Sequence, residues 1–365
     1  MEDIRFDQVS VVFPGGTQGL KDITLDVGAG EFVALVGPSG SGKTTLLRSL
    51  AGFVEPTSGH VYVGGRDMNG IPPEERHMGM VFQQHAVWPH MTVARNVEYP
   101  LVRAGVDKRE RTTRVRDALT LVGLDSLQDR KPDALSGGQR QRVSLARAIV
   151  GEPRVLLLDE ALSALDEPLR DVLRRELVAL TRTRGLTTLH VTHDRQEALA
   201  MADRIAVLDH GELQQVATPD ELYSSPSSAW VAQFFSDATV LRARRDGFEY
   251  VSSDPVMSFH TSNLVVADNS GGTQSDVVRD LGDEIDIAVL PSSVRIVDTS
   301  DPRSTRGTIE SALFELDGHS VTVDVEGTIF RAKVRGSRPR IGDVVGVRTE
   351  RVLAYPAAAG TERTS

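Results

Sequence analysis

The segment Phe32-Val-Ala-Leu-Val-Gly37-Pro-Ser-Gly-Ser-Gly-Lys43-Thr44-Thr45 decides the fold. Its apolar start is typical of a strand buried on both faces of a parallel sheet, and a helical pattern follows over 44–50. Glycines between a strand and a helix let backbone N–H groups surround phosphates, Lys43 reaches the terminal phosphates, and the Thr44 hydroxyl can ligate Mg²⁺. The predicted nucleotide-binding residues are Gly37, Pro38, Ser39, Gly40, Ser41, Gly42, Lys43, Thr44 and Thr45.

The first 235 residues alternate between strand-like and helix-like patterns. Strands are predicted at 4–13, 23–27, 32–36, 155–158, 188–191 and 204–208, and helices at 44–50, 108–122, 138–150, 168–184 and 195–201. Strands separated by helices of this length are joined by right-handed crossovers. The pattern therefore predicts an α/β domain with a mostly parallel sheet.

The sequence changes character near residue 236. Helical periodicity ends, and short alternating runs such as 320–325 are bounded by turn pairs such as Asp317-Gly318, which predicts a small β-barrel or sandwich over 236–355. Within it we expect two similar halves and a loop. The halves span 238–297 and 305–354, the loop spans 269–273, and residues 356–365 are expected to form a flexible tail.

Composition excludes several classes of protein. The 365 residues contain no cysteine, so neither disulfides nor thiolate-bound metal can hold the fold. The 41 basic residues against 51 acidic ones give a net charge of -10, and we therefore expect no nucleic acid partner. No apolar run approaches the roughly 20 residues that cross a bilayer, and the N-terminus lacks the pattern of a signal peptide. Any role at a membrane is expected to be peripheral.

Two further motifs supply chemistry. The strand Arg154-Val-Leu-Leu-Leu-Asp159-Glu160 ends in two carboxylates whose side chains diverge, so that Asp159 can hold Mg²⁺ while Glu160 orients and deprotonates the attacking water. In Leu135-Ser136-Gly137-Gly138-Gln139, Ser136 is a predicted N-cap and the glycines allow close backbone approach. One chain thus carries two helix starts that can bind an anion.

Taken in this order, the motifs resemble those of the ATP-binding cassette (ABC) ATPases, which are P-loop NTPases. The resemblance covers residues 1–235 and rests on the phosphate loop, Gln83, the segment 135–139, Asp159-Glu160, Ser163-Ala-Leu-Asp166 and His193. It implies a cassette with a mostly parallel core sheet, an antiparallel β subdomain and a helical subdomain at about 84–150. It also implies ATP hydrolysis with Mg²⁺.

The resemblance further implies a head-to-tail dimer of two copies. ATP on the phosphate loop of one subunit would be closed over by Ser136, Gly137, Gly138 and Gln139 of the other. Gln83 would contact Mg²⁺ and the attacking water, His193 the γ-phosphate, and Asp166 the opposite subunit. Phe13 stands where the family stacks an aromatic ring on adenine, although phenylalanine is also a common core residue at a strand end. One departure is Ala161, where many relatives have proline.

Subfamily features suggest an importer. Residues 83–93, 130–136 and the β-rich tail resemble the importer ATPases of the maltose, polyamine, sulfate and ferric-iron group, which append an OB-like (TOBE) β-barrel domain. Segment 84–93, with Trp88, is expected to line the groove for a permease helix, or else to fill the core of the helical subdomain.

The resemblance implies partners and a location. Two copies of the ATPase would bind a membrane permease at the cytoplasmic face, and an extracytoplasmic solute-binding protein would act only indirectly. We expect the cargo to be ferric iron, a polyamine or a phosphonate, with a sugar or sulfate importer as the alternative. A soluble non-transport ABC ATPase and a non-hydrolysing ATP-dependent scaffold remain further alternatives.

Overall fold

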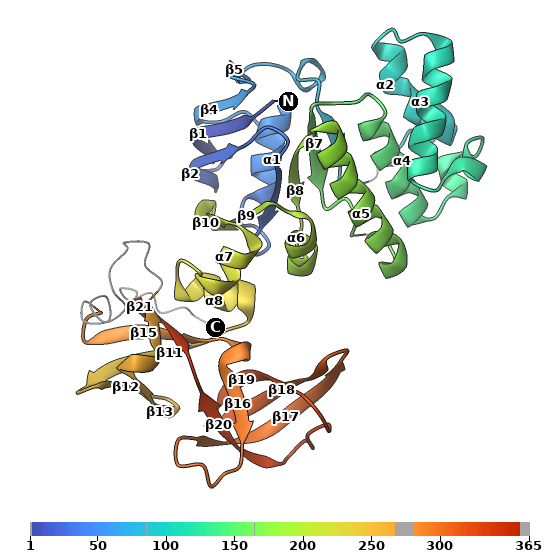
Figure 1. The fold of residues 1–365 in the computed structure, drawn as a ribbon. Coiled ribbons are helices and arrows are strands. Elements are labelled where there is room, and N and C mark those ends of the chain that lie inside the picture. The colour runs from blue at the N-terminus through green and yellow to red at the C-terminus, as the bar shows by residue number, and fades with distance from the viewer. Residues whose placement is uncertain (1, 85, 164, 267–280, 358–365) are drawn as a thin grey trace. The chain divides into compact units, whose positions relative to one another are not determined.

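The structure is a computed structural model that describes residues 2–84, 86–163, 165–266 and 281–357 (Figure 1). The chain forms two compact units, Met1–Pro219 and Asp220–Ser365. None of the described helices combines the length and the apolar character that crossing a bilayer requires.

A six-stranded sheet forms the centre of the first unit. Its order is β10 (Glu212–Ala217), β9 (Arg204–Asp209), β3 (Phe32–Val36), β8 (Thr187–Val191), β7 (Val155–Asp159) and β6 (Gly79–Val81). All neighbouring pairs are parallel except β9 and β10. Every residue of β3, β7 and β8 is buried. Burial on both faces explains why β3 and the first four residues of β7 are continuous apolar runs in the sequence. The predicted mostly parallel sheet is confirmed.

A second, antiparallel sheet completes the first unit's β structure. It has the order β2 (Gln18–Val27), β1 (Ile4–Val12), β4 (Ser58–Val63) and β5 (Arg66–Asp67). Helix α1 (Lys43–Ala51) joins both sheets through one apolar cluster, in which Leu46, Leu47 and Leu50 are fully buried. The phosphate loop therefore leads from a buried strand into a helix fixed on both sides.

Helices α2 (Val93–Arg103), α3 (Lys108–Leu121) and α4 (Gly137–Ile149) group together at one end of the first unit (Figure 1). They share one apolar cluster with α5 (Glu167–Arg184) and strands β6 and β7. Helix α2 is absent from the helices that the sequence pattern predicts, because Pro100 lies inside it and interrupts the pattern. The remaining helix of this unit, α6 (Arg195–Met201), begins as predicted.

The second unit begins earlier than the sequence pattern indicates. Helices α7 (Pro219–Ser224) and α8 (Ala229–Ser236) precede the expected boundary at 236, yet α8 packs against the strands that follow. Ala232 shares an apolar cluster with Ala288 and Leu353, and the Tyr355 hydroxyl donates a hydrogen bond to the carbonyl oxygen of Pro226 at 3.0 Å. These contacts explain why the compact units divide between residues 219 and 220.

The described strands of this unit form two sheets. One has the order β13 (Val256–His260), β12 (Glu249–Ser253), β11 (Thr239–Asp246), β15 (Glu284–Val289), β21 (Val352–Pro356) and β14 (Leu264–Val266); the other has the order β16 (Val294–Val297), β20 (Val344–Thr349), β17 (Thr305–Glu315), β18 (Gly318–Val325) and β19 (Thr328–Val334). The predicted β-rich domain is confirmed.

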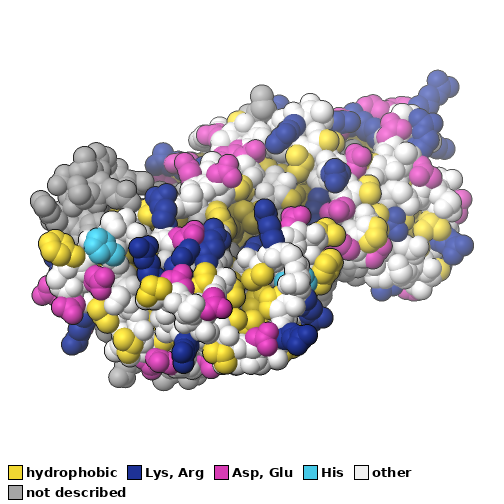
Figure 2. Space-filling model, turned by 60° about the horizontal axis from the view of Figure 1, so that its bottom comes forward, with side chains coloured by type: hydrophobic (Ala, Val, Ile, Leu, Met, Phe, Trp, Pro, Cys, Tyr) yellow, Lys and Arg dark blue, Asp and Glu magenta, His cyan; other side chains and the backbone are white. Residues whose placement is uncertain are grey.

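The expected division into halves 238–297 and 305–354 is wrong, because each sheet includes a strand that the sequence pattern assigns to the other half. Strand β16 pairs with β20, and β21 pairs with β15. The loop expected at 269–273 and residues 358–365 of the expected tail lie outside the described residues. Leu313, Phe314 and Leu316, near the β17–β18 turn, are 65%, 75% and 97% exposed. Figure 2 shows hydrophobic side chains interspersed with basic and acidic ones over the face that it brings forward.

Candidate active site

The phosphate loop takes a backbone path that requires glycine. Gly42, the N-cap of α1, has φ +100°, and a Cβ at this position would lie 2.6 Å from the carbonyl oxygen of Gly19. At Gly37, with φ +157°, a Cβ would lie 2.1 Å from the carbonyl oxygen of Leu208. Any side chain would therefore disturb both the loop and its packing on neighbouring segments.

Lys43 folds back over this loop. Its Nζ donates hydrogen bonds to the carbonyl oxygens of Gly37 at 2.9 Å and Pro38 at 2.8 Å, and lies 3.3 Å from Ser41 Oγ. Burial lowers the pKa of the Lys43 amine, while the charges of Glu160 and Asp159 act in the opposite direction. The loop thus holds a buried cation that has only neutral oxygens as direct partners.

Asp159 ends β7 beside the phosphate loop and is fully buried. Its Oδ1 accepts a hydrogen bond from Thr44 Oγ1 at 3.2 Å, and its Oδ2 lies 3.9 Å from Arg48 Nη2 with no hydrogen-bond partner. Burial raises the pKa of this carboxyl group. A buried carboxylate oxygen that has no hydrogen-bond partner among the described residues, next to a hydroxyl, suits a hard divalent cation such as Mg²⁺.

The carboxyl ends of neighbouring strands bring Gln83, Glu160 and His193 together. Glu160 Oε2 accepts a hydrogen bond from Gln83 Nε2 at 2.9 Å and lies 3.7 Å from His193 Nδ1. Glu160 has φ +49°, a strained conformation for a residue with a side chain, and its N–H donates to the carbonyl oxygen of Val191 at 3.0 Å. The turn thus directs the carboxylate toward the other two side chains. The three residues predicted from separate motifs form one cluster.

The loop after Glu160 has an additional support. Ala161, which stands where many relatives have proline, is fully buried, and its carbonyl oxygen accepts a hydrogen bond from Gln141 Nε2 at 2.8 Å. Gln141 itself is 2% exposed and lies on α4. Sequence reasoning missed this residue, whose only signal is a polar side chain on the buried face of the predicted helix.

The segment after His193 is held by a buried polar group that sequence reasoning also missed. The Thr192 hydroxyl donates to Glu197 Oε2 at 2.5 Å, and His190 Nε2 lies 3.5 Å from Glu197 Oε1. Burial by itself raises the pKa of the Glu197 carboxyl, but His190, the Thr192 hydroxyl and the charge of Arg174 outweigh it, so this pKa is lowered. Asp194 caps α6, accepting from the N–H groups of residues 196 and 197.

Ser136 and Gln139 form a capping box at the start of α4. Ser136 Oγ accepts from the Gln139 N–H at 3.2 Å, and Gln139 Oε1 accepts from the Ser136 N–H at 2.9 Å. Gly137 and Gly138 begin the helix, so their N–H groups lie in its first turn. Among the described residues, no hydrogen bond or ion pair joins this segment to the phosphate loop of the same chain.

Phe13, Asp166 and Trp88 lie at the surface or near it. Phe13 follows β1 and is 37% exposed, and Asp166 is the N-cap of α5 without a side-chain cap bond. Trp88 is half-buried, with its ring 4.5 Å from that of Tyr99 and 4.6 Å from the guanidinium carbon of Arg147.

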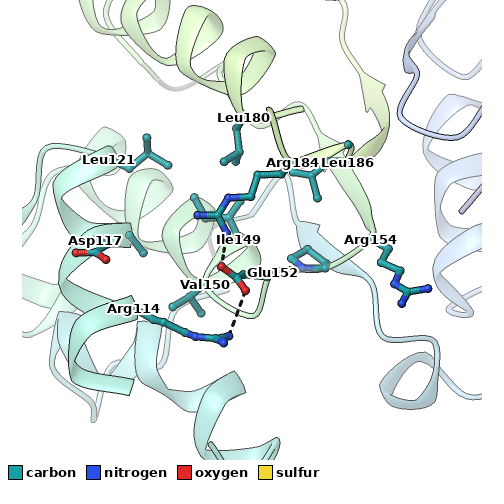
Figure 3. A pocket seen from close by; sticks show the side chains of 13 residues that line it. Arg114, Asp117, Leu121, Ile149, Val150, Glu152, Arg154, Leu180, Arg184 and Leu186 are labelled. Carbon is teal, nitrogen blue, oxygen red and sulfur yellow. Dashed lines mark hydrogen bonds and ion pairs between the residues drawn. The ribbon is translucent and has the colours of Figure 1, made fainter. Parts of the chain in front are cut away.

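A cavity of about 480 Å³ lies elsewhere in the first unit, between α3 and the ends of α4 and α5. Figure 3 shows Glu152 between Arg114 and Arg184, over a wall of aliphatic side chains. None of the predicted nucleotide-binding or catalytic residues lines it. The cavity is therefore distinct from the cluster around Glu160.

Comparison with known proteins identifies the family. A family model described as ABC transporter matches residues 20–163. The spermidine/putrescine import ATP-binding protein PotA of Rubrobacter xylanophilus is 43% identical over 304 residues, which cover 82% of this chain and 77% of that protein. PotA of Nitrosospira multiformis is 39% identical over 354 residues, with 95% and 94% covered.

A solved structure agrees with these relatives. The dimeric ATP-binding cassette MJ0796, in a post-hydrolysis state bound to ADP and Pi, matches with a TM-score of 0.56 and 33% identity, over 59% of this chain and 98% of that one. The chain therefore belongs to the ABC transporter family, as the ATP-hydrolysing subunit of an importer.

Proposed function

We propose that this ATPase drives the import of a polyamine of the spermidine or putrescine class. The observation that carries the proposal is its 39% identity, over 94% of the relative's length, to an import protein named for these two compounds. The similarity to this relative covers 95% of the chain and so includes the second unit. The MJ0796 cassette, by contrast, matches only 59% of the chain although 98% of its own length is covered.

We propose that Glu160 is the general base of hydrolysis. A carboxylate at the edge of the sheet, held by Gln83 and close to His193, can accept the proton of a water aimed at the γ-phosphate. Gln83 orients that water, and the imidazole of His193 contacts the γ-phosphate. The 2.9 Å hydrogen bond between Gln83 and Glu160 supports the role of Gln83 in orienting the water.

In this proposal the phosphate loop binds ATP and Mg²⁺. The backbone N–H groups that the phosphate loop offers and the ammonium group of Lys43 bind the β- and γ-phosphates, and the ring of Phe13 stacks on the adenine. Thr44, Asp159 and Gln83 would hold Mg²⁺, which neutralises charge on the phosphate oxygens when it is bound. The buried Oδ2 of Asp159, which accepts no hydrogen bond from the described residues, supports this assignment.

We infer that two copies form a head-to-tail dimer with ATP between them. The first turn of α4, with Ser136 to Gln139, would close over the nucleotide of the partner, and Asp166 would reach across the interface. Two features support this arrangement: the second anion-binding helix start on one chain, and the dimeric state of the MJ0796 cassette.

We further infer that the dimer binds a membrane permease at the cytoplasmic face of the membrane. The surface around Trp88 and Tyr99 would receive a short permease helix, since it presents aromatic rings and a cation on half-exposed segments. An extracytoplasmic solute-binding protein would deliver the cargo without touching this chain.

The cargo can be tested by uptake. Cells without polyamine uptake of their own would express this chain with the permease and solute-binding protein from the same genome. We expect uptake of labelled spermidine that is lost in the Glu160→Gln variant. If sulfate, maltose or ferric iron is taken up in place of spermidine, the polyamine assignment is wrong, although the ATPase assignment stands.

A further inference from the structure

Arg174 stands between two loops of the site. It lies in the third turn of α5, and its side chain is only 12% exposed. Its Nη1 lies 3.3 Å from Glu167 Oε1 and 3.1 Å from Asp171 Oδ1, and its Nη2 lies 3.4 Å from Asp194 Oδ2. One guanidinium group therefore joins the start of α5 to the start of α6.

At the α6 end, Arg174 contacts the residue that directly follows His193. The two carboxylate oxygens of Asp194 have different partners. Oδ1 accepts hydrogen bonds from the N–H groups of residues 196 and 197, and Oδ2 faces Arg174. The Asp194 N–H donates to Thr192 Oγ1 at 3.0 Å. The backbone on both sides of His193 is thus held, and Arg174 is the link that comes from another helix.

At the α5 end, the link reaches the loop before Asp166. Glu167 directly follows Asp166, and its Oε2 accepts a hydrogen bond from Arg170 Nη1 at 2.8 Å. Arg170 Nη2 donates to the carbonyl oxygen of Leu165 at 2.7 Å. A hydrogen bond from Arg170 to the Leu165 carbonyl oxygen is therefore continued by ion pairs through Glu167 and Arg174 to Asp194.

The chemistry of arginine suits this position. A planar guanidinium group presents several donors in fixed directions and can serve carboxylates of two elements at once, whereas a lysine ammonium acts as a single point charge. Because Arg174 is largely buried, its pairs are screened less by solvent and salt than surface pairs are.

We propose that Arg174 is a positioning residue that couples the loop of Asp166 to the loop of His193. The inference rests on the roles proposed above for these two residues. A displacement of the Asp166 loop by the second subunit would be transmitted through Glu167 and Arg174 to Asp194, and so to the position of His193. Arg174 acts through other residues and touches no reacting atom.

The test measures ATP hydrolysis by the full-length chain. For Arg174→Ala we expect kcat to fall about tenfold while the KM for ATP stays within about twofold, because the phosphate loop is untouched. Arg174→Lys should recover part of kcat, since a lysine ammonium can still pair with one of the three carboxylates. Arg175→Ala is the matched control on an exposed neighbour and should behave as the unmodified chain does.

A double-mutant cycle distinguishes coupling from general destabilisation. Asp194→Asn keeps the oxygen that caps α6 but removes the charge facing Arg174. If the two residues act together, the Arg174→Ala and Asp194→Asn double variant is no slower than the slower single variant. If Arg174→Ala does not fold, Arg174→Lys takes its place in the cycle with Asp194→Asn.

Three results would overturn the inference: an unchanged kcat in Arg174→Ala, a KM that rises as much as kcat falls, or single effects that multiply in the double variant. His193→Ala is measured in parallel. Near-native hydrolysis by that variant would remove His193 from the catalytic role, which is a failure of the proposed function and is separate from the behaviour of Arg174.

Discussion

Glu160 combines a strained backbone with a chemically useful position. Its φ of +49° is held by the hydrogen bond from its N–H to Val191, and its carboxylate meets Gln83 in consequence. Strain of this kind costs on the order of 1–3 kcal/mol and persists only where the surrounding structure enforces it. The neighbouring strand β8 therefore determines the direction of this side chain.

The role of Glu160 predicts the behaviour of Glu160→Gln. The amide keeps the size of the side chain but cannot accept a proton, so we expect ATP binding to persist while turnover falls about 10²–10⁴-fold. Calorimetry would follow binding, and phosphate release would follow turnover. A variant that hydrolyses ATP at nearly the native rate would show that another group is the base.

Glu197 predicts a pH dependence of stability. Its folded-state pKa is lowered from the ordinary value of 4.5, so the carboxylate stabilises the fold above that pH, and the contribution is lost as the pH falls through the lower, folded-state value. We expect Glu197→Gln to reduce the free energy of unfolding by about 1–3 kcal/mol at pH 7. We also expect the variant to lose less stability than the unmodified chain between about pH 5 and pH 3.

Urea unfolding at several pH values would check this expectation. Glu176→Gln, on the exposed face of α5, is a suitable control because its side chain lies at the surface. If the free energy of unfolding fell equally steeply between about pH 5 and pH 3 in Glu197→Gln and in the unmodified chain, the carboxylate would contribute nothing to this pH dependence.

At the scale of elements, the predicted helices and strands of the first unit agree with the structure because their signals are local. A buried parallel strand reads as a continuous apolar run, and α4 and α6 begin at residues whose side chains cap them. Helix α2 has the same kind of start, with Thr92 accepting from the Arg95 N–H, but Pro100 obscures its pattern. Packing of α2 against α3 and α4 compensates for that proline.

The segment before α2 predicts a separation of transport from hydrolysis. Asn96 fixes the backbone of Trp88 on both sides, and Tyr99 and Arg147 contact its ring. Trp88→Ala should leave ATP hydrolysis by the isolated chain within about twofold and abolish uptake through the permease, because the catalytic cluster does not involve this ring. Circular dichroism provides the control: a loss of helix content would favour a purely structural role.

At the scale of the whole molecule, the proposed head-to-tail dimer makes each site depend on residues from two chains. If Ser136 to Gln139 complete the partner's site, hydrolysis depends on association, so the specific rate should fall on dilution as dimers dissociate. Light scattering at the same concentrations would give the oligomeric state. A specific rate that stays constant in a demonstrably monomeric sample would contradict the shared site.

The sequence by itself determined the phosphate loop, the acidic end of β7, the capped start of α4 and the change to β structure in the C-terminal part. Each of these depends on residues close together in the chain, through backbone conformation, capping or periodicity. Only the tertiary structure decided that α8 belongs to the second unit. It also decided that β16 pairs with β20 and β21 with β15, and that Arg174 joins α5 to Asp194. The physical reason is that strand pairing and charge contacts between distant segments depend on how the chain packs, and no short stretch of sequence encodes that packing.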